Sequence, residues 1–308
     1  MNTPRILLFG KGGQVATELV PLLSVLGELT VSGPDDCSFE DLGSVERKII
    51  DCKPDIIVNA AAYTAVDRAE SEEALCFAVN AAAVAKIADT AKQLNALVVH
   101  YSTDYVFDGM AAVPYTEDDK PHPQGVYGKS KREGEVFLEN SGASFMLFRT
   151  AWVYSSIGKN FMKTMLTLGK ERKELSVVKD QFGCPTSAKL ISVATAFALQ
   201  KWWQSGKSVR SELEGTYNLV ASGSCSWHEF AEAIFEGARE YISREKISLS
   251  LNLETVHAIC TSEYPTAAKR PAYSVLQNTK FQQVFGLNLP PWNVGLNFVL
   301  SEYLNRHL

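Results

Sequence analysis

A tyrosine and a lysine stand four positions apart in the stretch YGKSK, from Tyr127 to Lys131. Residues at this spacing share one face of a helix, so the phenol and the ammonium are neighbours. An unperturbed tyrosine has a pKa of about 10, and a nearby ammonium favours the phenolate and lowers that pKa. Such a pair predicts general acid catalysis, in which the tyrosine gives a proton to a substrate oxygen. The pattern alone is common, so its meaning depends on its setting.

A pair of hydroxyl residues precedes this stretch in the chain. Ser102 and Thr103 end the apolar run ALVVHYST, which predicts a buried strand. A hydroxyl from Thr103 at a strand end is suited to hydrogen-bond the oxygen that receives the proton. Helix caps and turns use the same residue types, and Asp104 and Tyr105 also fit a turn, so that alternative stays open.

A glycine loop lies near the N-terminus, in LLFGKGGQVA. Gly10, Gly13 and Ala16 follow one another at three-residue intervals between an apolar run and a helical pattern. In a dinucleotide site the first glycine permits a tight turn and the second lets the backbone approach the pyrophosphate. The amides at the start of the helix then face phosphate oxygens. A plain strand-to-helix turn is the alternative, but position and context favour nucleotide binding.

The second predicted strand bears on the choice of coenzyme. An NAD site commonly has an acidic residue about 20 residues after the glycines. Here the sequence LTVSGPDD ends that strand in Ser32 and Gly33, with no acid before Asp35. Lys11, inside the glycine loop, is suited to attract a 2'-phosphate. NADPH is therefore favoured, and NADH remains an alternative.

Short apolar runs alternate with helical patterns through the first half of the chain. Strands are predicted at residues 5–10, 29–33, 55–62, 96–103 and 145–154, and helices at 14–26, 44–54, 72–94 and 126–140. This alternation predicts an α/β fold with a Rossmann-type, doubly wound parallel sheet. Ligands of such sheets bind at the carboxyl ends of the strands, where the glycine loop and Thr103 are expected to lie.

The second half has a different pattern. Strands are predicted at 175–186 and 215–222, helices at 190–203, 226–241 and 294–304, and a proline-bearing loop at 264–276. We expect residues 1–154 to form mainly the cofactor-binding part with the catalytic residues. Residues 155–308 then form a smaller α/β substrate-binding part, interleaved with the first.

Composition excludes several classes of partner. The 308 residues carry a net charge of −5 and no basic block, which argues against nucleic acid and anionic membranes as partners. We find no signal-peptide pattern and no apolar run of membrane-spanning length. The six cysteines form no CxxC pair. Reduced cysteines in a cytoplasmic protein are the expectation.

Seven segments together resemble one enzyme family. They are LLFGKGGQVA, DIIVNAAAYTAVDRAE, HYSTDYVFDG, VYGKSKREGE, FRTAWVY, DQFGCPT and RPAYSVL. In this order they resemble the extended short-chain dehydrogenase/reductase superfamily and, within it, the dTDP-4-dehydrorhamnose reductases. The resemblance runs from Arg5 to about Leu300, nearly the whole chain.

The resemblance implies NADPH-dependent reduction of the C4 keto group of dTDP-4-dehydro-L-rhamnose, for cell-surface polysaccharide synthesis. It implies that Tyr127 donates the proton, that Lys131 tunes Tyr127 and holds the nicotinamide ribose, and that Thr103 contacts the reacting oxygen. The implied cofactor residues, besides Tyr127 and Lys131, are Gly10, Lys11, Gly12, Gly13, Gln14, Val15, Ser38, Phe39, Ala61, Ala62, Tyr63, Thr64 and Tyr101. The implied substrate residues, besides Thr103, are Asp104, Trp152, Gln181, Phe182, Pro185, Arg270 and Pro271. From composition alone, Trp152 fits a core aromatic equally well.

Two positions depart from the family pattern. Ser38 replaces the usual aspartate, which leaves the coenzyme preference open. Some members bind Mg²⁺ through a glutamate where this chain, in CPTSAK, has Lys189. A cation does not ligate a cation, so the sequence predicts no metal site. A homodimer, if it forms, then needs a basis other than that metal.

Two other functions remain as alternatives. One is a different sugar-nucleotide 4-reductase or a 4-epimerase of the same superfamily. The other is a non-catalytic regulatory subunit resembling the beta subunit of methionine adenosyltransferase, against which the intact set of Thr103, Tyr127 and Lys131 argues.

Overall fold

A parallel sheet forms the centre of the computed structural model, which describes residues 3–245 and 251–306. Its six strands lie in the order β10-β5-β4-β3-β1-β2, and every neighbouring pair is parallel. The strands are β1 (Arg5–Phe9), β2 (Glu28–Ser32), β3 (Ile56–Asn59), β4 (Leu97–Thr103), β5 (Phe145–Thr150) and β10 (Gly215–Asn218). The predicted Rossmann-type α/β fold is confirmed. The chain reverses its winding between β1 and β3, so a ligand crevice is expected beyond their carboxyl ends.

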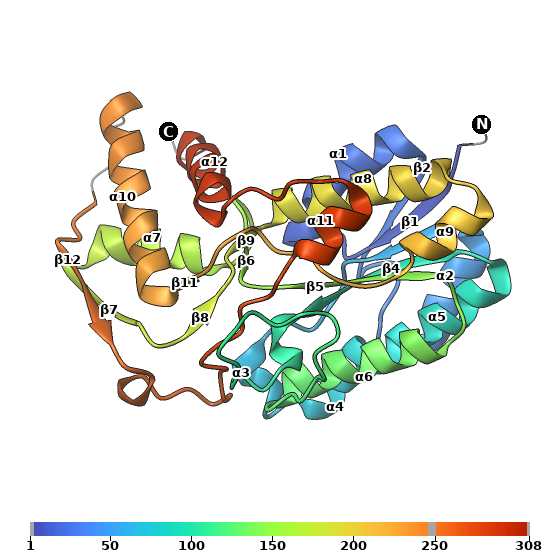
Figure 1. Cartoon of the computed structure of the whole chain (residues 1–308), viewed down its shortest axis with the longest axis horizontal. Helices are drawn as coiled ribbons and strands as arrows, with labels where there is room; N and C mark the ends of the chain where they lie inside the picture. Colours follow the sequence, from blue (N-terminus) through green and yellow to red (C-terminus); the bar gives the residue numbers. More distant parts are fainter. Residues whose placement is uncertain (1–2, 246–250, 307–308) are drawn as a thin grey trace.

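Helices cover both faces of the sheet (Figure 1). One face carries α1 (Gln14–Leu26), α8 (Ala188–Gln204) and α11 (Thr279–Phe285), and the other carries α2 (Leu42–Cys52), α5 (Ala83–Leu94) and α6 (Val126–Asn140). The central strands β1, β3, β4 and β5 are largely apolar because side chains on both of their faces are buried. Leu8 packs beneath α1 and α8, whereas its neighbour Leu7 packs beneath α2 and α5.

The helical stretch predicted at 72–94 is one continuous helical segment in three parts. It consists of α4 (Glu73–Phe77), a π-helical turn (Ala78–Ala82) and α5. By length and composition alone this segment reaches the size of a membrane span, which the sequence did not lead us to expect. Half of its most apolar window is buried in the structure, and α5 packs against the sheet. This burial is typical of a core helix.

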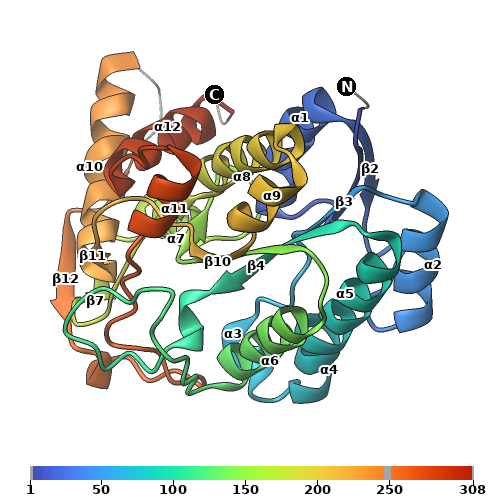
Figure 2. The same cartoon turned by 45° about the vertical axis from the view of Figure 1, so that its right-hand side comes forward.

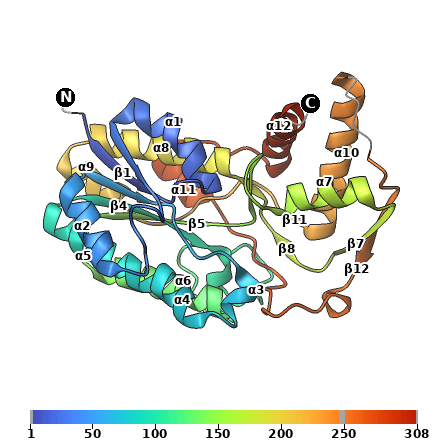
Figure 3. The same cartoon turned by 180° about the vertical axis from the view of Figure 1, so that it is seen from behind.

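A smaller lobe is formed by the second half of the chain and lies at the end of the sheet opposite to α2 and α5 (Figures 1 and 3). Its helices are α7 (Phe161–Glu171), α10 (Trp227–Glu245) and α12 (Trp292–Asn305). Short strand pairs complete it: β7 (Glu174–Val178) with β12 (Thr255–Ile259), β8 (Phe182–Gly183) with β11 (Cys225–Ser226), and β6 (Val153–Tyr154) with β9 (Thr186–Ser187).

The second half also contributes to the first sheet. Strand β10 pairs with β5 at the sheet edge, and α8 packs on α1 (Figure 2). The remaining short helices are α3 (Val66–Ala69) and α9 (Lys207–Leu213). The assignment of cofactor binding to residues 1–154 and of substrate binding to 155–308 therefore stays a proposal about function, made for two interleaved parts.

Several predicted elements differ from the observed ones. The run 145–154 is divided into β5 and β6, because Trp152 between them has φ +47°, a left-handed conformation. The run 175–186 is divided into β7, β8 and β9. Helices α3, α7, α9 and α11 and strands β11 and β12 were not predicted.

Candidate functional site

Two adjoining cavities open at the carboxyl ends of the central strands. One has a volume of about 310 Å³ and the other about 570 Å³. Both are lined by Gly13, Ala60 and Ala62, so they meet where the turn after β1 faces the segment after β3. Together they form an elongated site of the kind that a dinucleotide and a second ligand require.

The glycine turn after β1 packs against the backbone of the segment after β3. Gly10 has φ +104°, and a Cβ atom on it would lie 2.7 Å from the carbonyl carbon of Ala60. A larger residue is therefore excluded by both conformation and contact. No side chain caps the start of α1 at Gly13, which leaves the first helical amides available to an anion. These features fit the phosphates of a dinucleotide.

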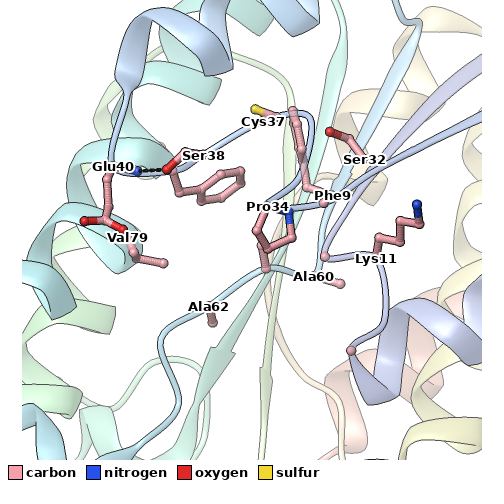
Figure 4. A pocket seen from close by; sticks show the side chains of 15 residues that line it. Phe9, Lys11, Ser32, Pro34, Cys37, Ser38, Glu40, Ala60, Ala62 and Val79 are labelled. Carbon is pink, nitrogen blue, oxygen red and sulfur yellow. Dashed lines mark hydrogen bonds between the residues drawn. The ribbon is translucent and has the colours of Figure 1, made fainter.

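The smaller cavity is lined by the residues expected at the adenine end (Figure 4). Lys11 lies on one side of it, and Ser38 and Glu40 lie on the other. The carboxylate of Asp36 is also near the end of β2, but it accepts hydrogen bonds from Ser32 Oγ and Gly33 N. It also pairs with Lys48 Nζ at 2.6 Å, and these bonds lower its pKa to about 2. The charged side chains of the cavity wall are thus Lys11 and Glu40.

Tyr127 and Thr103 lie together in the larger cavity. The Thr103 hydroxyl opposes the effect of burial on the Tyr127 pKa, and Thr103 Oγ1 donates to Asp104 Oδ1 at 3.0 Å. Burial raises the pKa of the Asp104 carboxyl to about 6. The structure therefore brings together a phenol, a hydroxyl and a carboxyl at the end of β4, which matches the predicted arrangement.

The first turn of α6 is fixed by contacts that place Tyr127. A Cβ atom on Gly128 would lie 2.2 Å from the carbonyl oxygen of Tyr105, so only glycine allows this approach. Glu70 Oε1 accepts a hydrogen bond from Val126 N at 2.9 Å and so satisfies an amide at the helix start. The ring of Tyr105 meets that of Tyr127 edge to face, with centroids 5.8 Å apart.

Lys131 lies one turn further along α6 and is buried. Its Nζ donates to the carbonyl oxygen of Tyr101 at 2.5 Å and lies 3.2 Å from His100 Nε2. Burial lowers the pKa of Lys131 to about 8. Burial also raises the pKa of Tyr127, with no contribution from Lys131. The lowering of the Tyr127 pKa that the sequence led us to expect is therefore absent from this arrangement.

Two stacked indoles form the far wall of the larger cavity. The rings of Trp152 and Trp227 are 3.5 Å apart and nearly parallel, at 5°. A Cβ atom on Gly183 would lie 2.4 Å from the Trp152 ring, so the glycine leaves room for the indole. Trp152 is thus held between α10 and β8 in its left-handed conformation. Backbone strain of this kind is concentrated at functional sites.

Most of the predicted residues line one of the two cavities. They are Gly10, Lys11, Gly12, Gly13, Gln14, Val15, Ser38, Phe39, Ala61, Ala62, Thr64, Tyr101, Thr103, Asp104, Tyr127, Lys131 and Trp152. Tyr63 instead donates its hydroxyl to Glu72 Oε2 at 2.6 Å.

The other predicted substrate residues lie outside the cavity walls. Gln181 donates to Thr261 Oγ1 at 3.1 Å, and Phe182 N to Ala272 O at 2.8 Å. Pro185 is buried. Arg270 lies on a loop that crosses from the small lobe to the large one. Its guanidinium pairs with Asp67 of α3 at 3.0 Å. The adjacent Pro271 packs against Gly109.

Sequence reasoning did not identify four residues that shape this site. Tyr105 and Trp227 line the larger cavity, Glu70 binds the start of α6, and His100 lies behind Lys131. Tyr105 had a weak signal in its place beside Asp104 at a strand end. The others contact the site only through the folding of distant segments, so no local pattern marks them.

Lys189 occupies the position at which some members of the family have a glutamate that binds Mg²⁺. Lys189 Nζ lies 2.9 Å from Glu302 Oε2, which joins α8 to α12. Within residues 3–245 and 251–306, no group of three or more His, Cys, Asp or Glu side chains is arranged to hold a metal ion. The residues at this position do not fit Mg²⁺.

Comparison with known proteins agrees with these features. The family model described as "RmlD substrate binding domain" matches residues 4–305. The chain is 46% identical to the dTDP-4-dehydrorhamnose reductase of Shigella flexneri over 301 residues, covering 96% of this chain and 97% of the relative. It is 35% identical to the spore coat polysaccharide biosynthesis protein SpsK of Bacillus subtilis, covering 97% of each.

A solved structure of a protein with the same name is also similar to this chain over nearly its whole length. The dTDP-4-dehydrorhamnose reductase of Bacillus anthracis, in complex with NADP, superimposes with a TM-score of 0.86 at 33% identity, covering 98% of this chain and 100% of that one. The full-length match includes the glycine turn, the end of β4 and the start of α6. The chain therefore belongs to the dTDP-4-dehydrorhamnose reductase family of nicotinamide-dependent oxidoreductases.

Proposed function

We propose that this enzyme reduces the C4 keto group of dTDP-4-dehydro-L-rhamnose with NADPH. The product, dTDP-L-rhamnose, serves cell-surface polysaccharide synthesis such as that of O-antigen, and we place the enzyme in the cytoplasm. The observation that carries the proposal is the placement of Thr103, Tyr127 and Lys131 in one cavity that adjoins the glycine turn.

The chain's own residues account for the proton transfer and its environment. When bound, the nicotinamide supplies the hydride to the carbonyl carbon. The Tyr127 hydroxyl then donates its proton to the carbonyl oxygen, and the Thr103 hydroxyl hydrogen-bonds the same oxygen. Because the pKa of Tyr127 is raised, the phenol is protonated before each reaction, as an acid must be. Lys131 holds the nicotinamide ribose, and it favours the phenolate only in the complex with cofactor, because in the structure described here the pKa of Tyr127 is raised.

The substrate is proposed to lie between the Tyr127 side of the cavity and the indole wall. Asp104 and Trp152 contact the sugar, and Arg270 on the crossing loop contacts the diphosphate, since a guanidinium suits phosphate oxygens. Gln181, Phe182, Pro185 and Pro271 form the adjacent nucleotide side. Arg270 and these four residues line neither cavity, so we place them around the part of the substrate that extends beyond it.

Two properties of the proposal concern the coenzyme and the metal. Lys11 favours the 2'-phosphate of NADPH, whereas Glu40 in the same wall opposes it, so some activity with NADH is expected. We propose that no metal is needed, because Lys189 pairs with Glu302.

The decisive experiment supplies the substrate and identifies the product. The enzyme is incubated with dTDP-4-dehydro-L-rhamnose while the absorbance of NADPH or NADH is followed, and the product sugar is identified by NMR. We expect stoichiometric oxidation of NADPH and formation of dTDP-L-rhamnose. Formation of the other C4 configuration would replace the proposal with a different 4-reductase.

The same experiment separates the two alternative functions. A 4-epimerase returns the hydride to the sugar, so it would be isolated with tightly bound NAD⁺ and would consume no NADPH. A non-catalytic subunit would show neither turnover nor product with any nucleotide sugar.

A further inference from the structure

A buried row of three polar side chains lies behind the catalytic face of α6. Asn59 at the end of β3, His100 on β4 and Lys131 on α6 are each no more than 2% exposed. His100 Nδ1 lies 3.1 Å from Asn59 Nδ2, and His100 Nε2 lies 3.2 Å from Lys131 Nζ. The proposed reaction gives His100 no part, yet its ring joins Lys131 to the neighbouring strand.

Asn59 determines which nitrogen of His100 carries the proton. The backbone N–H of Ala61 donates to Asn59 Oδ1 at 3.1 Å, which fixes the amide oxygen on that side. The NH₂ group then faces the ring, and an amide NH₂ is only a donor. His100 Nδ1 must accept this bond. A neutral imidazole therefore carries its proton on Nε2.

Lys131 consequently faces a donor on one side. The N–H of His100 Nε2 points to Lys131 Nζ, and an ammonium has no lone pair to accept it. The carbonyl oxygen of Tyr101 is the acceptor that the structure gives to Lys131. The contact with His100 becomes a hydrogen bond when Lys131 is a neutral amine. Burial also favours the neutral amine, because it lowers the pKa of Lys131 to about 8.

We propose that His100, oriented by Asn59, is a positioning residue that keeps Lys131 ready to release its proton until the cofactor binds. The nicotinamide ribose hydroxyls then supply acceptors for the ammonium, so cofactor binding at slightly alkaline pH takes up a proton. This coupling rests on the proposed role of Lys131. The placement of the His100 proton on Nε2 does not depend on that role.

Other titratable groups around Lys131 keep one protonation state between pH 7 and 9. Glu135, one turn further along α6, is held ionised because its ion pairs with Arg149 and Arg132 lower its pKa. Burial raises the pKa of the Cys76 thiol on α4 and of Tyr127, so both stay neutral. Burial and Lys131 lower the pKa of His100 well below its ordinary value, so it also stays neutral. Between pH 7 and 9 the proton change in this cluster therefore belongs to Lys131.

The first test observes His100 directly, without cofactor. The protein is labelled with ¹⁵N-histidine, and the signals of its five histidines are recorded by two-bond ¹H–¹⁵N NMR. His100→Gln identifies the His100 signal. We expect a neutral ring with its proton on Nε2 at pH 7. A proton on Nδ1 would overturn the inference, whatever reaction the enzyme catalyses.

The second test reverses the tautomer with an isosteric change. Asn59→Asp keeps one oxygen for Ala61 N and presents the other to His100 Nδ1. The ring proton then moves to Nδ1, and Nε2 becomes an acceptor for the Lys131 ammonium. NADPH binding is measured by calorimetry at pH 8.5 in two buffers of different ionisation enthalpy. We expect the wild type to take up about half a proton or more and the variant much less.

A control and the contrary outcomes complete the design. His122→Gln changes an exposed histidine, 76% accessible, and should behave as the wild type. Equal proton uptake by wild type and Asn59→Asp, with the tautomer shown to be reversed, would refute the coupling. Failure of the wild type to bind NADPH would instead refute the proposed function and leave the NMR result valid.

Discussion

Tyr127 and Asp104 show how burial sets the chemistry of single residues at this site. Tyr127 lies in the first turn of α6 and Asp104 directly follows β4, and burial raises the pKa of each. For Tyr127 the consequence bears on its proposed role, because the protonated phenol is the form that acts as an acid. For Asp104 the consequence is a cost in stability, because its ionised form is disfavoured where it lies.

Tyr127→Phe removes the proton donor and keeps the ring. We expect loss of most reductase turnover, by about 100-fold or more, which is the usual contribution of a general acid. NADPH binding should be nearly unchanged, because the ring still fills its place against Tyr105. Steady-state rates and a fluorescence titration with NADPH measure the two effects. Turnover at the wild-type rate would exclude Tyr127 as the acid.

Asp104→Asn should stabilise the protein in a pH-dependent way. The pKa of Asp104 is about 6 in the folded state and about 4 when unfolded, so the folded protein holds the proton more tightly. Its contribution to stability is full below pH 4 and is lost as the pH rises through 6. At pH 7 the variant should gain about 1–3 kcal/mol relative to the wild type. Urea unfolding at pH 4 and pH 7 tests this, and a gain of equal size at both values would contradict it.

The chemical residues were predictable because their order and spacing carry the signal. Gly10, Thr103, Tyr127 and Lys131 each follow or open an element that the apolar pattern identifies. Trp227 and His100 could not be predicted as site residues, since their contacts to the site join segments that are far apart in the sequence. No local pattern marks such a contact.

At the scale of elements, α6 is attached to the sheet by a buried ion pair. Glu135 accepts hydrogen bonds from Arg149 Nε at 3.0 Å and from Nη2 at 2.9 Å, and the two side chains are 0% and 2% exposed. Arg132 reaches the same carboxylate from α6, at 2.7 Å, but is 25% exposed. The pair fixes the helix that carries Tyr127 and Lys131 against β5.

Arg149→Met should destabilise the fold by about 3–5 kcal/mol, because Glu135 keeps its charge in the interior. The matched change Arg132→Met should cost less than about 1 kcal/mol, since that side chain is partly solvated. The double replacement Arg149→Met with Glu135→Leu should recover most of the loss. The free energy of unfolding in urea measures all three. Equal costs for the two arginine variants would show that the buried pair is not what attaches α6.

The central strands were predictable as elements, and several later ones were not. Strands β1, β3 and β4 are continuous apolar runs, buried on both faces. Strand β12 is mostly exposed, so it has no such run. The break at Trp152 depends on a positive φ in a residue other than glycine, which the sequence does not signal.

At the scale of the whole molecule, Lys189 joins the large lobe to the C-terminal helix. Its ammonium pairs with Glu302 on α12, which also binds Arg306. We therefore expect reductase rates to be unchanged by EDTA and by added Mg²⁺. Assays of protein treated with EDTA, before and after Mg²⁺ is restored, check this. A clear loss of rate with EDTA that Mg²⁺ reverses would show a metal requirement.

The place of β10 in the sheet has a consequence for how the chain is synthesised. Strand β5 leaves the ribosome before β10, α8 and α11, which later cover its edge and one face of the sheet. The nascent first half of the chain therefore presents an open strand edge and an apolar surface for part of its synthesis. Such surfaces favour association with other chains or with chaperones. The enzyme completes its six-stranded sheet only after residue 218 has been translated.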